Sequence, residues 1–218
     1  MNRSQLPLPN FFHAHYFNLT SLTPIQEKAI NAGILKQQSL LVCAPTASGK
    51  TLVATIALVN SLSLTSQSKA IYLVPLKALA NEKYKEYQDL FKDTEYKVTI
   101  ATGDIDSDSP YLANYNLLIL TTEKLDSLLR HRVSWINQVN CIIIDEIHLL
   151  NDQSRGPTLE IILTLLKTLT NPQIIGLSAT IGNPQELADW LNATLVQDTW
   201  RPVQLKQGIY TKEKLEFY

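Results

Sequence analysis

The feature that most constrains the fold is a regular alternation of short apolar runs with longer amphipathic segments. Six runs rich in β-branched residues have the length of buried strands, at 39–43, 70–74, 97–101, 116–120, 139–144 and 173–177. Segments with apolar residues three and four apart lie between most of them, at 50–61, 76–91, 122–131, 157–169 and 184–191. Strands that alternate with helices favour parallel pairing through crossover helices. The sequence therefore predicts an α/β fold, a doubly wound, mostly parallel sheet with helices on both faces.

Composition and charge add further limits to this prediction. Hydrophobic residues make up 45% of the 218 residues, which is enough for one sizeable core, and no apolar run approaches the roughly 18 residues of a membrane span. The 19 basic and 20 acidic residues balance to a net charge of −1, so any nucleic acid must be held by local geometry. Cys43 and Cys141 lie in apolar runs, where reduced thiols are expected. With no export signal near the N-terminus, we expect a cytoplasmic protein without a membrane partner.

Polar or Gly- and Pro-marked segments follow each of the six apolar runs. In chain order they read APTASGKT, PLKALA, TGD, TTEK, DEIH and SAT. The carboxyl ends of parallel strands meet at one edge of the sheet, and ligands of open α/β sheets bind beyond that edge. We therefore expect these segments to gather at one site.

The first of these segments, 44–51, follows a strand and opens a helix, as a phosphate-binding loop does. Backbone N–H groups and the helix N-terminus would cradle the phosphates of ATP, Lys50 would add a charge, and the Thr51 hydroxyl would bind Mg²⁺. Gly49 allows close approach of the backbone, whereas Ala44 stands where the general pattern begins with glycine. An ordinary strand-to-helix turn with one lysine is the alternative. The predicted nucleotide contacts are Thr46, Ala47, Ser48, Gly49, Lys50 and Thr51.

The run at 139–144 supplies the second half of a nucleotide site, because it delivers two carboxylates to the same edge. Asp145 is predicted to hold Mg²⁺, mostly through water, and Glu146 to orient or deprotonate the attacking water. An exposed acidic pair that starts a turn is the alternative. The catalytic residues predicted from these two segments are Glu146, Lys50 and Asp145.

Seven segments in this order resemble the first motor lobe of superfamily-two DExH helicases. They are PTASGKT, PLKALA, TGD, TTEK, DEIHLL, RGPTLE and LSATIGN, and the resemblance extends from about residue 22 to 203. It is strongest to the Ski-two-like branch, which includes archaeal DNA helicases that act at stalled replication forks. The resemblance implies a RecA-like lobe that binds ATP and Mg²⁺. In this branch alanine at 44 and 47 is a normal variant.

The resemblance also implies roles for residues outside the phosphate loop. Gln26 would read the adenine edge, although Thr23 and Pro24 also suit a plain helix start. The elements that grip the phosphates of a single strand would comprise Pro75, Lys77, Thr121 and Thr122, with helix caps as the alternative. Nucleotide state would be coupled to the lobe interface through His148, Ser178 and Thr180.

The expected protein is therefore the ATP-binding motor lobe of a nucleic-acid helicase. Residues 1–203 would form the lobe, and 204–218 the start of a linker to a second lobe that this chain lacks, with a strand or hairpin expected over 207–218. Single-stranded DNA is favoured over RNA as partner, with 3′-to-5′ translocation driven by ATP hydrolysis. Two alternatives remain: an RNA helicase of the same branch, and a phosphate-loop ATPase switch that acts on a protein partner.

Overall fold

A seven-stranded, all-parallel sheet forms the centre of the molecule. The computed structural model describes residues 3–103, 109–179, 181–203, 208–211 and 214–217. The strands of the sheet lie in the order β3-β4-β2-β5-β6-β1-β7. Their bounds are β1 Leu40–Cys43, β2 Lys69–Val74, β3 Val98–Ala101, β4 Leu117–Thr121, β5 Val139–Ile144, β6 Gln173–Ser178 and β7 Thr194–Gln197. The predicted α/β class and parallel pairing are confirmed.

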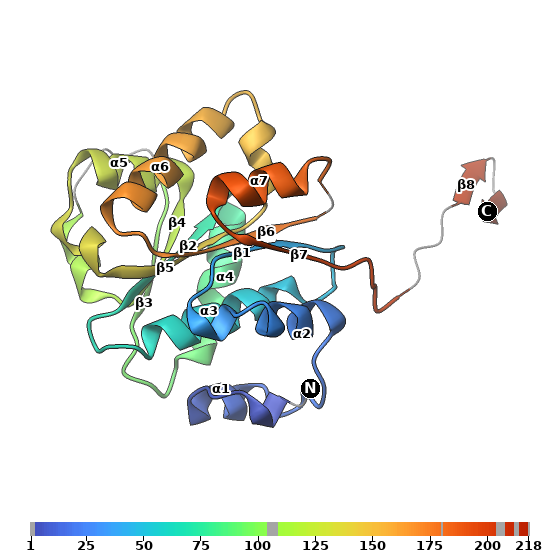
Figure 1. Ribbon diagram of the computed structural model, residues 1–218, viewed down its shortest axis with the longest axis horizontal. Coiled ribbons are helices and arrows are strands. Elements are labelled where there is room, and N and C mark those ends of the chain that lie inside the picture. Colours follow the sequence, from blue (N-terminus) through green and yellow to red (C-terminus); the bar gives the residue numbers. More distant parts are fainter. Residues whose placement is uncertain (1–2, 104–108, 180, 204–207, 212–213, 218) are drawn as a thin grey trace.

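Helices cover both faces of this sheet (Figure 1). One face carries α2 Pro24–Asn31, α3 Lys50–Leu62 and α4 Lys77–Leu90, and α1 Asn10–His15 packs outside this layer against α4 (Figure 1). The other carries α5 Thr122–Arg130, α6 Gly156–Leu169 and α7 Pro184–Leu191. Short 3-10 turns complete the chain at η1 Arg3–Gln5, η2 Ile34–Lys36, η3 Pro110–Asn114, η4 Ser134–Gln138 and η5 Ile147–Asn151. No helix in the described part of the chain is long and apolar enough to cross a membrane.

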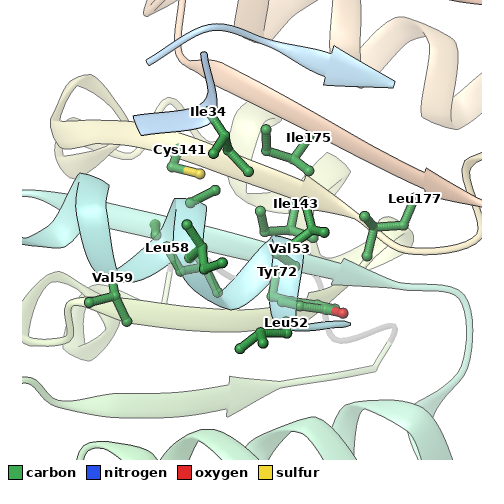
Figure 2. Packing of buried hydrophobic residues seen from close by; sticks show 14 of the residues in the cluster. Ile34, Leu52, Val53, Leu58, Val59, Tyr72, Cys141, Ile143, Ile175 and Leu177 are labelled. Atoms are coloured by element: carbon green, nitrogen blue, oxygen red, sulfur yellow. The ribbon is translucent and has the colours of Figure 1, made fainter. Parts of the chain in front are cut away.

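Helix α3 is buried against the middle of the sheet, and this packing fixes where the preceding loop lies. Most of its side chains are buried, because the sheet covers one side and neighbouring helices cover others. Figure 2 shows α3 and sheet side chains in one cluster with Ile34, namely Leu52, Val53, Leu58, Val59, Tyr72, Cys141, Ile143, Ile175 and Leu177. The two cysteines are buried and unbridged, as the sequence predicts.

Strand β7 was not predicted from the sequence. It is an edge strand that pairs, within the described part of the chain, with β1 alone, and just one of its four residues is buried. A strand exposed in this way carries no continuous apolar run, so the pattern that found the central strands misses it. Beyond the sheet, β8 Gly208–Thr211 and β9 Lys214–Phe217 pair with each other as an antiparallel hairpin.

The strand register brings the polar segments to one edge. Cys43 at the end of β1 is level with Ser178 at the end of β6, and Val74 of β2 is level with Thr121 of β4. Next to β2, Leu73 is level with Ile144, so the acidic pair follows at the same height. The predicted gathering of the segments is therefore confirmed for the strands that lie side by side.

Candidate active site

The loop between β1 and α3 is a tight turn held at both ends. Its first residue, Ala44, is fully buried, and its N–H donates to the Ser178 carbonyl at 3.2 Å. Ala47 has φ 65° and Gly49 has φ 97°, so two residues of the loop adopt the left-handed conformation. Only glycine does so without steric cost, which explains the glycine directly before α3. The loop ends there, because Gly49 is the N-cap of that helix.

The Lys50 ammonium lies across this loop. Its Nζ donates to the carbonyl oxygens of Ala44 at 2.6 Å and Pro45 at 3.0 Å. Burial lowers the pKa of Lys50, against the opposing effect of the Glu146 and Asp145 carboxylates, which raise it. The ammonium and the two carboxylates therefore share one electrostatic environment, although they come from segments far apart in the sequence.

Two features of the loop suit an anion. Among the residues that the structure describes, no side chain donates or accepts a hydrogen bond at the N-cap of α3, so its first N–H groups are not capped by a side chain. Ser48 is 1% exposed, and its Oγ has no hydrogen-bond partner among the described residues. A buried hydroxyl without a partner costs free energy, which a phosphate oxygen would recover. The loop residues therefore fit a bound nucleotide phosphate.

Helix α2 supports the loop from the other side. The Thr23 hydroxyl donates to the Ser48 carbonyl at 2.9 Å, and Gln26 Nε2 donates to the Gly49 carbonyl at 3.1 Å. Gln26 Oε1 in turn accepts from the Thr23 N–H at 2.9 Å, which completes a capping box. A Cβ at position 49 would displace the end of the Gln26 side chain, and the left-handed φ of Gly49 is the firmer reason for glycine at this position. Both polar atoms of the Gln26 amide, Oε1 and Nε2, thus make hydrogen bonds within the protein. That Gln26 binds the adenine edge stays a prediction.

Asp145 follows β5 and is fixed at both carboxylate oxygens. The Glu146 N–H donates to Oδ1 at 3.1 Å, and the phenol of Tyr72 donates to Oδ2 at 3.1 Å. Tyr72 is fully buried on β2, and burial, with smaller contributions from Tyr87 and Asp145, raises its pKa well above the ordinary value. Tyr72 was not predicted as a site residue; the one available signal was a polar-tipped residue in the middle of an apolar strand.

Glu146, the next residue, has an unusual backbone. Its φ of 52° places a non-glycine residue in the left-handed region, where strain of about 1–2 kcal/mol is typical. His148 Nδ1 lies 3.3 Å from Glu146 Oε2 and 3.4 Å from the Ser178 hydroxyl. His148 thus connects the carboxylate with the end of β6, whose Ser178 carbonyl also holds Ala44. Its coupling role stays a prediction, and Thr180, the third residue predicted for this role, lies outside the described residues.

The residues predicted to hold nucleic acid lie at two neighbouring helix starts. Lys77 opens α4 and is exposed, whereas Thr122 opens α5 and is half-buried. Neither helix has a side-chain hydrogen bond at its cap, and the buried Thr121 hydroxyl has no partner among the described residues. Pro75 lies beside them, and a narrow groove joins it and Thr122 to the acidic pair.

Arg155 is a second residue in this region that was not predicted to belong to the site. Its guanidinium Nη1 donates to the Pro75 carbonyl at 3.4 Å, and it lines the groove together with Asp145 and Glu146. Asp152 Oδ1 fixes the turn that carries it by accepting the N–H groups of Ser154 and Arg155, both at 2.9 Å. Arg155 therefore lies between the acidic pair and the predicted nucleic-acid elements.

The donor set suits Mg²⁺. Thr51 is the second residue of α3, Asp145 follows β5, and both offer hard oxygen ligands. In the described part of the chain no three His, Cys, Asp or Glu side chains gather as a closed metal site would require. Mg²⁺ commonly takes only one or two protein ligands and completes its shell with waters and substrate phosphates.

The parallel sheet, the glycine-marked loop before a buried helix and the acidic pair on a neighbouring strand define a RecA-like P-loop domain. Residues 23–187 match the DEAD/DEAH box helicase family, which is about three quarters of the chain. The chain belongs to that family, and the resemblance found in its sequence is confirmed.

Individual relatives agree with this assignment. The chain is 52% identical over 206 residues to the ATP-dependent DNA helicase Hel308 of Methanocaldococcus jannaschii, covering 92% of this chain and 17% of that protein. It is 54% identical over 192 residues to Hel308 of Pyrococcus horikoshii, covering 88% and 26%. The crystal structure of the DUF1998 helicase MrfA bound to DNA superposes with a TM-score of 0.78 at 26% identity, covering 91% and 30%. The chain thus spans about a quarter or less of the length of these Hel308 relatives.

Proposed function

We propose that this chain is the ATP-binding motor lobe of a DNA helicase, formed by residues 1–203, with 204–218 leading towards a second lobe. The observation that carries the proposal is the strand register, which brings the Lys50 loop after β1 and the acidic pair after β5 to one edge of the sheet, on either side of β6. The proposed nucleotide contacts are Gln26, Thr46, Ala47, Ser48, Gly49, Lys50 and Thr51. We place the working protein in the cytoplasm.

In the proposed hydrolysis of ATP, the carboxylates of Asp145 and Glu146 have different roles. Thr51 and Asp145 would hold Mg²⁺, which supplies charge neutralisation on the phosphates when it is bound. Glu146 follows Asp145 and precedes the 3-10 turn η5. Its carboxylate would orient the attacking water and accept its proton. Lys50 would exchange its contacts with the loop carbonyls for the phosphates.

Nucleic acid would bind at the helix starts that carry Pro75, Lys77, Thr121 and Thr122. Uncapped helix N-termini attract phosphate without a large net charge, which agrees with the overall charge of −1. The Hel308 relatives are named DNA helicases and the structural neighbour is bound to DNA, which favours DNA as the strand. We propose 3′-to-5′ movement from the resemblance to the Ski-two-like branch. His148, Ser178 and Thr180 would report the nucleotide state to the second lobe.

The test is ATP turnover and strand displacement by the full-length protein on matched DNA and RNA substrates. The DNA proposal expects stimulation of ATP hydrolysis and unwinding with single-stranded DNA, more than with RNA. Stimulation by RNA instead would support the RNA helicase. ATP hydrolysis indifferent to both nucleic acids would support a phosphate-loop switch acting on a protein, and would overturn the helicase proposal.

A lysine pair on one helix tests the strand contacts. Lys77→Ala should weaken single-strand binding and reduce the slope of log affinity against log salt by about 1. Lys85→Ala is the matched control, because Lys85 is also exposed on α4 but lies two turns from its N-terminus. Equal effects of the two substitutions would show that the start of α4 has no special part in binding.

A further inference from the structure

The Asp145 carboxylate is held by one donor on each oxygen. The Tyr72 hydroxyl donates to Oδ2 at 3.1 Å, while the backbone N–H of Glu146 donates to Oδ1 at 3.1 Å. The backbone of Asp145 is fixed as well, since its N–H donates to the Leu73 carbonyl at 3.0 Å. Strand β2 therefore anchors both the side chain and the backbone of Asp145, because it carries Tyr72 and Leu73 at adjacent positions.

We propose that Tyr72 is a positioning residue for Asp145: its buried phenol fixes the carboxylate in the orientation that Mg²⁺ bound with ATP requires. This inference rests on the proposed Mg·ATP site. Groups that orient a metal ligand commonly change metal affinity by 10- to 100-fold when they are removed. A carboxylate free to rotate would have to be ordered each time the metal binds, which lowers the affinity for the metal.

The phenol is suited to this task because its own position is fixed. Tyr72 is 0% exposed and its ring packs against Tyr87 at a centroid distance of 5.6 Å. The Lys83 ammonium lies 5.9 Å from the centre of the same ring. Figure 2 shows the Tyr72 ring among the apolar side chains packed between α3 and the sheet, with its oxygen at the tip of the ring. Its hydroxyl therefore reaches Asp145 from a rigid part of the core.

Tyr87 provides a matched control. It is also fully buried, and its hydroxyl lies 3.2 Å from the Thr55 hydroxyl rather than at the acidic pair. Tyr72→Phe and Tyr87→Phe each remove one buried phenol oxygen and keep the ring. A merely structural role would give the two variants similar behaviour in every measurement.

The experiment measures binding of a non-hydrolysable fluorescent ATP analogue to the purified protein while Mg²⁺ is titrated. Tyr72→Phe should raise the half-saturating Mg²⁺ concentration roughly tenfold or more, and leave analogue binding in EDTA unchanged. Tyr87→Phe should keep the Mg²⁺ requirement of the unmodified protein. Thermal unfolding of both variants shows that each is folded at the temperature of the titration.

A double-mutant cycle tests whether the effect of Tyr72→Phe acts through the Asp145 carboxylate. In an Asp145→Asn background, Tyr72→Phe should add no further change, because the carboxylate it orients is gone. An unchanged Mg²⁺ requirement in Tyr72→Phe, or an equal shift in Tyr87→Phe, would overturn the inference and leave the nucleotide site standing. If the unmodified protein binds the analogue without any Mg²⁺ dependence, the proposed Mg·ATP site itself is wrong.

Discussion

Replacing Lys50 with alanine should weaken nucleotide binding by about tenfold. A charge-assisted contact to phosphate contributes roughly 1.5–3 kcal/mol, which corresponds to about 10- to 100-fold in affinity. The lower end applies here, because the ammonium already donates two hydrogen bonds, to the carbonyls of Ala44 and Pro45, that binding must replace. The free energy gained on binding phosphate is therefore partly offset by the breaking of these two hydrogen bonds.

The same substitution should also lower stability without nucleotide. The Ala44 residue is 0% exposed, and removal of Lys50 takes away a donor 2.6 Å from its carbonyl. An unsatisfied buried acceptor costs about 1–3 kcal/mol, and because Lys50 is itself half-buried we expect about 1 kcal/mol. The midpoint of thermal unfolding should then fall by roughly 2–4 °C for a chain of this size.

Titration of a fluorescent ATP analogue in the presence of Mg²⁺ measures the first effect, and thermal unfolding without nucleotide measures the second. Lys85→Ala, an exposed site on α4, is the control and should change neither quantity. Nucleotide affinity that remains unchanged in Lys50→Ala would refute the assignment of the loop. Lower affinity with unchanged stability would refute only the idea that the ammonium supports the empty loop.

Three further outcomes follow from individual residues. Glu146→Gln should bind ATP with Mg²⁺ normally and lose most hydrolysis, because the amide cannot accept the proton of the attacking water; normal turnover would place that role elsewhere. Gly156→Ala should lower the free energy of unfolding by about 1–3 kcal/mol in a denaturant titration, since its Cβ would collide with backbone of the preceding turn. Gly182→Ala has open space and should be neutral, so similar losses in both would contradict this reason. Burial raises the pKa of the Cys43 thiol to about 11 and that of Cys141 also upwards, so a thiol reagent at about pH 8 should label neither until the chain is denatured; rapid native labelling would contradict the burial.

The sequence by itself determined the class of fold and the edge where the site lies. The periodicity of apolar residues depends on the surroundings of each short segment. The run 139–144 is apolar because it is buried on both faces, and the residue that follows this strand must lie at the edge of the sheet. The sequence could also predict that other segments lie at this edge, because each of them follows a buried strand. These segments are the phosphate loop, the acidic pair and the helix starts at Lys77 and Thr122. The left-handed backbone of Glu146 left no trace in the residue types.

Only the tertiary structure decided which side chains meet. Tyr72 reaches Asp145 because β2 and β5 are neighbours in the sheet, a pairing between segments far apart in the chain. In the same way Gln26 meets Gly49, and Arg155 meets Pro75, through packing that no spacing within one segment encodes. Local patterns report the surroundings of each residue, burial above all, whereas contacts between distant segments depend on strand order and on how helices pack across the sheet. The segments that meet at the candidate site were therefore readable from sequence, and the groups that position their side chains were not.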